Sequence, residues 1–125
     1  MTNSEINIAI AKALGLSVCE DQDCSGCDAQ AFVCLGIAAR LGADGQPVAL
    51  PWATSADSCF RDLIPEAESR GCVWQVQSIS GHPGAARAVF LLPESSGLTY
   101  NQRIRDAVDL VPRAICLAWL GSKRP

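Results

Sequence analysis

Residues 73–92, VWQVQSISGHPGAARAVFLL, carry the clearest indication of the fold. Two runs rich in β-branched and aromatic residues, VWQVQSI and ARAVFLL, flank the glycine- and proline-containing segment SGHPG. Runs of this composition form strands, and the segment between them is typical of a turn. The pattern therefore predicts a β-hairpin with His82 in its turn.

The N-terminal segment is predicted to form an amphipathic helix. The apolar side chains of residues 5–14 recur at helical spacing and share one stripe. Thr2 and Glu5 have the spacing of a capping box, and Gly15 is suited to the position that follows the last helical turn.

Two further segments show helical periodicity interrupted by a proline. Residues 54–71 begin with TSAD, which supplies an N-cap and places Asp57 in the capping-box position. Pro65 should bend this helix or restart it. Residues 100–120 carry a last apolar stripe, and Pro112 predicts either a kinked helix or two short ones there.

Residues 29–41 leave two alternatives open. The apolar run AFVCLGIA, the turn-rich GADGQP and the short VALP predict two strands joined by a turn. A helix over 29–41, capped by Asp28 and Gly42, fits the same residues, because Cys34 and Ile37 also begin a helical stripe.

The order helix, two strands, helix, hairpin, helix predicts an α+β domain. We expect one domain over residues 1–125, built as a small two- or three-layer sandwich. Its sheet should be mostly antiparallel, with three or four strands and about three helices. The chain is 49% hydrophobic and 18% charged, which is enough apolar surface for a core that needs no metal or disulfide.

The composition also limits the partners. The net charge is -3 and the basic residues are scattered, so a nucleic-acid partner is not expected. No export signal and no apolar run of about 18 residues is present, so we expect a cytoplasmic protein with no membrane contact. Monomer and homodimer both stay open.

A cysteine-rich segment over residues 19–34 is the most unusual feature of the chain. Cys24 and Cys27 form a CxxC half-site, with Cys19 and Cys34 as the remaining candidate ligands for one zinc ion. Unmetallated thiols are the slightly favoured alternative. Cys19, Cys24 and Cys27, with Cys59 as a distant fourth ligand, also have the spacing of a plant-type iron–sulfur cluster.

The sequence offers little to a catalytic interpretation. His82 is the only histidine, and it has no nucleophile or carboxylate partner in a recognisable motif. We therefore expect no enzymatic activity. Trp52 lies outside the periodic segments, so it is the best candidate for an aromatic side chain that anchors a partner, with core packing as the alternative.

Several short segments resemble a known group of proteins. INIAIAKALG, DGQPVALP leading into TSADSCF, and PRAICLAWL are similar to segments of the small phage-encoded proteins of the phage ABA-sandwich and NinX-like group. The resemblance implies a phage or prophage origin and a compact α/β sandwich, and it implies no catalytic residues. The cysteine segment is not part of it.

Two functions follow as hypotheses. The first is a non-catalytic phage or prophage accessory protein that binds a host or phage macromolecule, and that acts against host defence. A protein partner is expected. The second is a metal- or redox-responsive module that uses the cluster of Cys19 to Cys34.

Overall fold

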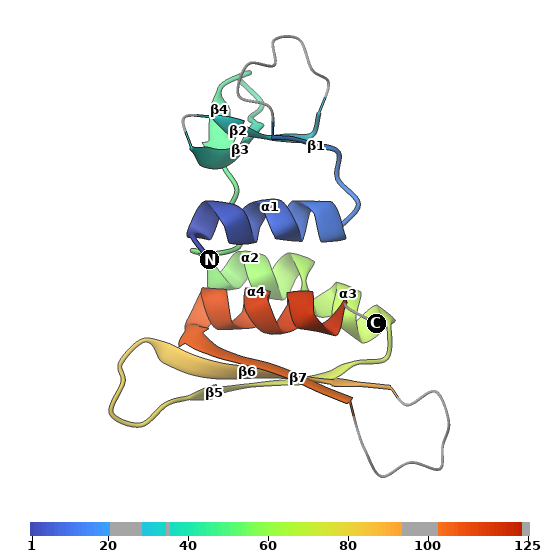
Figure 1. The fold of residues 1–125 in the computed structure, drawn as a ribbon, viewed down its shortest axis with the longest axis vertical. Coiled ribbons are helices and arrows are strands. Elements are labelled where there is room, and N and C mark those ends of the chain that lie inside the picture. The colour runs from blue at the N-terminus through green and yellow to red at the C-terminus, as the bar shows by residue number, and fades with distance from the viewer. Residues whose placement is uncertain (21–28, 35, 94–102, 124–125) are drawn as a thin grey trace.

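The chain forms four layers, seen from top to bottom in Figure 1. The computed structural model describes residues 1–20, 29–34, 36–93 and 103–123. A small four-stranded sheet lies above helix α1, a layer of three further helices follows, and a three-stranded sheet closes the other end. The elements are α1 Asn3–Ala13, β1 Val18–Cys19, β2 Ala31–Cys34, β3 Ile37–Leu41, β4 Pro47–Ala49, α2 Ala56–Asp62, α3 Ile64–Ser69, β5 Val73–Ser78, β6 Ala85–Leu92, β7 Arg103–Leu110 and α4 Val111–Ser122.

The predicted α+β class is confirmed, but the strands divide between two sheets rather than sharing one, so the elements form four layers rather than two or three. The four-stranded sheet has the order β1-β2-β3-β4, and the three-stranded sheet has the order β5-β6-β7. All pairs are antiparallel except β1 with β2.

The hairpin over residues 73–92 is confirmed. β5 pairs with β6 from Val73 opposite Leu91 to Ser78 opposite Ala86. The connecting turn contains His82, and Gly81 and Gly84 each have a φ of 81° there. A side chain at either glycine would be strained in this left-handed conformation, which explains the composition of the turn.

The expectation of helix over residues 103–110 is wrong, and residues 100–102 of the same prediction lie outside the described residues. Residues 103–110 form β7, which pairs with β6 along its whole length, and the helix begins only at Val111 with a proline in its first turn. Ile104 and Val108 are four positions apart, and this spacing places two residues on one face of a strand as well as on one face of a helix. The second half of the expected helix is confirmed as α4.

The first helix is confirmed together with its capping box, and the second is confirmed without the capping-box role of Asp57, because the Ser55 hydroxyl accepts from the Ser58 backbone instead. The hydroxyl of Thr2 accepts a hydrogen bond from the Glu5 backbone at 3.1 Å, and the Glu5 carboxylate accepts one from the Thr2 backbone at 3.2 Å. The segment from Ala56 to Ser69 is interrupted next to Pro65, as expected, giving α2 and α3. Its N-cap is Ser55, one residue later than predicted.

Residues 29–41 form strands, not a helix. Gly36, with a φ of 78°, follows β2 and precedes β3, so the apolar run folds back on itself as a hairpin of its own. The expected turn follows between β3 and β4, with Gly45 in the left-handed region.

The core lies mainly between α4 and its neighbours. One face of α4 packs against β6 and β7, and the helix also contacts α1 and α2. The largest fully buried side chains come from α1, α4, β6 and the α2–α3 junction: Trp119, Phe90, Ile6, Ile10, Leu63 and Ile115. None of the helices in the described ranges has the length and apolar content that crossing a bilayer requires.

Candidate functional site

The three-stranded sheet packs against α4 with one face, and no other helix or strand of the described residues covers its other face. Side chains alternate along each strand, so residues paired across the strands share a face. On the inner face, Phe90 and Ala88 of β6 are fully buried. On the outer face, Val73, Leu91 and Ile104 form one row across the sheet, and Val108 lies opposite Arg87 further along.

This outer face is apolar and exposed. Val73 and Val108 are 62% and 60% exposed, and Ile104 and Leu110 are about half exposed. Arg87 and Asp106 form an ion pair at 3.0 Å between β6 and β7, so the charged groups on this face neutralise each other. Single exposed apolar residues are ordinary, but a group of them on one sheet face is typical of an interaction surface.

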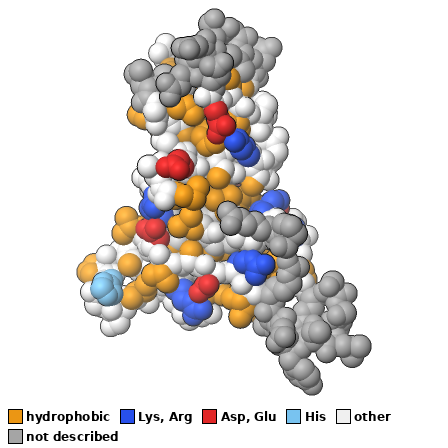
Figure 2. All heavy atoms as spheres, in the orientation of Figure 1, with side chains coloured by type: hydrophobic (Ala, Val, Ile, Leu, Met, Phe, Trp, Pro, Cys, Tyr) orange, Lys and Arg blue, Asp and Glu red, His pale blue; other side chains and the backbone are white. Residues whose placement is uncertain are grey.

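The outer face also has a hollow beside β5. Its volume is about 160 Å³, and Val73, Gln75, Val89 and Leu91 line it together with Trp74. Interface anchors are commonly side chains that fill pockets of this kind. Figure 2 shows hydrophobic side chains over the sheet end of the molecule as well as over the helices.

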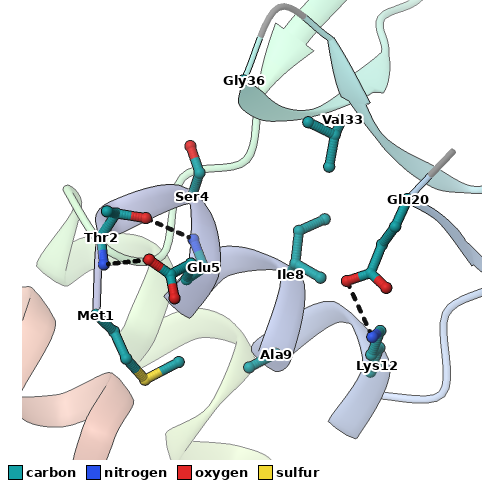
Figure 3. Close-up of a pocket in the computed structure, with 10 residues that line it drawn as sticks. All are labelled: Met1, Thr2, Ser4, Glu5, Ile8, Ala9, Lys12, Glu20, Val33 and Gly36. Atoms are coloured by element: carbon teal, nitrogen blue, oxygen red, sulfur yellow. Dashed lines mark hydrogen bonds and ion pairs between the residues drawn. The ribbon is translucent and has the colours of Figure 1, made fainter. Parts of the chain in front are cut away.

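A second concave region lies between α1 and the four-stranded sheet. It encloses about 420 Å³, and Figure 3 shows Ile8 of α1 and Val33 of β2 pointing toward one another across it. Lys12 and Glu20 pair at 3.0 Å on one side, and the Glu5 carboxylate stands on the other. The hydrogen bonds from the backbone and the hydroxyl of Thr2 lower the Glu5 pKa. The groove thus combines an apolar floor with acidic side chains at its rim.

Two buried thiols face one another between α2 and α4. The Sγ atoms of Cys59 and Cys116 are 3.6 Å apart, and the Cys59 thiol lies 3.1 Å from the Trp52 carbonyl. The hydrogen bond with Cys59 and burial raise the pKa of the Cys116 thiol. A protonated thiol is a poor nucleophile and metal ligand, so Cys116 serves core packing, and Cys59 is fully buried beside it.

The predicted zinc ligands are only partly covered by the structure. Cys24 and Cys27 lie outside the described residues. Cys19, in β1, is half-buried, and it pairs with Phe32, two positions before Cys34 in β2. Neighbouring strands therefore carry the two outer cysteines, and the zinc ion stays a prediction.

Trp52 is placed in the core rather than on the surface. Its side chain is 5% exposed, and the indole nitrogen donates to Asp62 at 2.8 Å. The hydrogen bond from Arg61 first, and that from Trp52 in addition, lower the pKa of Asp62. This placement of Trp52 corresponds to the core-packing alternative. His82, the residue considered for a chemical role, lies exposed in the hairpin turn.

Sequence reasoning missed a charged cluster around Glu66. Its carboxylate accepts hydrogen bonds from Arg70 at 2.9 Å, from the Trp119 indole at 3.0 Å and from Lys123 at 3.0 Å. Burial raises the Glu66 pKa, but the hydrogen bonds and charges of Arg70 and Lys123 outweigh it and lower that pKa overall. The cluster joins α3 to the end of α4, so its role is structural.

The outer sheet face was missed as well, although the sequence contained a signal for it. Ile104, Val108 and Leu110 are all even-numbered, and this spacing places them on one face of a strand.

Comparisons with protein-family models, with curated proteins and with solved structures find no match to this chain.

Proposed function

We propose that this chain is a non-catalytic binding protein that docks another protein on the outer face of the β5-β6-β7 sheet. The observation that carries the proposal is the group of exposed apolar side chains on this face: Val73, Ile104, Val108 and Leu110. Burial of an apolar side chain in an interface contributes about 1.5–3 kcal/mol, so four of them supply substantial affinity.

The charges of this face support a protein partner. The chain carries a net charge of -3, yet the outer face contains the neutralising pair Arg87 and Asp106 at its centre. Interface cores are depleted in unpaired charge and surrounded by polar groups. The hollow beside Val73 adds a position where one side chain of the partner can anchor.

On the basis of the resemblance to phage-encoded proteins, we propose that the chain is a phage or prophage accessory protein. Its partner would then be a host or phage protein, including components of host defence. The sheet face accounts for binding and does not depend on that origin.

Position-specific photo-crosslinking tests the proposal. A photoreactive amino acid replaces Val108 in one variant and His82, exposed in the hairpin turn, in the control. In bacterial cells, the variant at 108 should crosslink to one protein that the variant at 82 does not capture. The captured protein, once purified, should bind the wild-type chain and bind a Leu110→Glu variant at least about tenfold more weakly. Equal binding to both chains would contradict the docking surface.

A further inference from the structure

The two edge strands of the β5-β6-β7 sheet differ in the side chains that they carry. β5 and β7 are the outer strands, so each has one side without a strand neighbour among the described residues. Edges of this kind are normally blocked by charged residues, prolines or covering segments, because they can pair with another chain.

The β7 edge is blocked by charge. Its sequence RIRDAVDL contains two arginines and two aspartates. Toward the core, Arg105 donates to the Gly121 carbonyl at 3.2 Å, and Asp109 pairs with Arg113 at 3.1 Å. Charged side chains therefore line the β7 edge and disfavour its pairing with another strand.

The β5 strand itself has no charge and no proline in its sequence VWQVQS. One charged group lies nearby, because Glu68 of α3 accepts a hydrogen bond from the Trp74 indole at 2.9 Å. Trp74 and Val76 face inward but are only partly buried, and Phe60, 40% exposed, packs on Trp74 with ring centroids 5.6 Å apart. Apolar side chains thus border the open edge on its inner side, as Val73 does on its outer side.

We infer that β5 pairs antiparallel with β5 of a second copy of this chain. The sequence of β5 is complementary to itself about Gln75. A two-fold axis at this residue sets Trp74 opposite Val76 of the second copy twice, and Val73 opposite Gln77 twice, with Gln75 opposite Gln75. Aromatic residues opposite β-branched ones are among the stabilising cross-strand pairs.

Charge and symmetry favour a second copy over an unrelated strand. Because β5 carries no charged residue, no like charges face each other between the two paired strands, and the isologous contact closes after two subunits. The pairing joins the two sheets into one of six strands. Six residues span roughly 20 Å, so the interface lies in the small class and forms only at about micromolar concentration or above.

The dimer uses the edge of the sheet and leaves Ile104, Val108 and Leu110 accessible, and it shares only Val73 and the hollow beside β5 with the proposed docking surface. A protein partner can bind the face of a monomer or of a dimer. The experiments are separate, since dimerisation is tested at Gln75 and docking at Val108 and Leu110.

Analytical ultracentrifugation of the full chain tests the pairing at concentrations from about 1 μM to about 1 mM, a range that spans weak interfaces. The wild-type chain should shift from monomer to dimer. Gln75→Lys and Gln75→Glu, at an exposed position, should each weaken dimerisation at least about tenfold, because like charges face each other across the axis. An equimolar mixture of the two variants should dimerise again.

A His82→Lys variant is the matched control, because it adds the same charge in the turn beyond β5 and should dimerise like the wild type. Circular dichroism establishes that each variant is folded. A wild-type chain that stays monomeric at the highest concentration would overturn the inference. So would a dimer that tolerates lysine at position 75, or charge variants that fail to associate when mixed.

Discussion

At the scale of single residues, Glu66 shows how the chain uses a partly buried carboxylate. Its lowered pKa means that the folded state holds the ionised form more strongly than the unfolded chain does. This contribution to stability is complete above the ordinary value of 4.5 and is lost as the pH falls through the lower folded value. Burial opposes this shift, and the hydrogen bonds and charges of Arg70 and Lys123 cause it.

Glu66→Gln should therefore destabilise the protein at neutral pH by about 1–3 kcal/mol, because charged hydrogen bonds to the carboxylate are lost. The free energy of unfolding of the variant should also fall less steeply than that of the wild type as the pH drops below 4.5. Urea denaturation at several pH values measures both. Parallel pH profiles for the two proteins would remove Glu66 from this role.

At the scale of elements, local chemistry determined which predictions held. The capping box of Thr2 and Glu5, the glycine-rich hairpin turn and the break at Pro65 depend on neighbours in sequence, and they could be predicted. The change from strand to helix at Val111 could not be located, because Ile104 and Val108 fit both periodicities. Pairing with β6 along eight residues decided it.

Polar substitutions on the buried face of α4 should destabilise the fold more than substitutions elsewhere. Ile115→Asp places a carboxylate at a fully buried position between α4 and its neighbours, and it should cost about 4 kcal/mol or more, enough to unfold a marginal domain. His82→Asp, in the exposed turn, should change stability by less than about 0.5 kcal/mol. Thermal unfolding followed by circular dichroism compares them, and a cooperative transition of Ile115→Asp near the wild-type temperature would contradict the burial.

At the scale of the whole molecule, the candidate site was less accessible to prediction than the fold. The sequence drew attention to cysteines and tryptophans, because these residue types carry chemistry and anchor interfaces. Trp52 and Cys59 turned out to be buried in the core. The outer sheet face arises only when β7 joins the hairpin, so it required the pairing of residues far apart in the chain.

The affinity of the purified partner for a Val108→Glu variant tests the docking surface on the outer sheet face most directly. Val108 is 60% exposed and lies opposite Arg87, so glutamate there should leave the free energy of unfolding within about 1 kcal/mol of the wild type. Binding should nevertheless weaken at least about tenfold, because a carboxylate would be buried in an apolar contact. A folded Val108→Glu protein that binds the partner with wild-type affinity would contradict the docking surface.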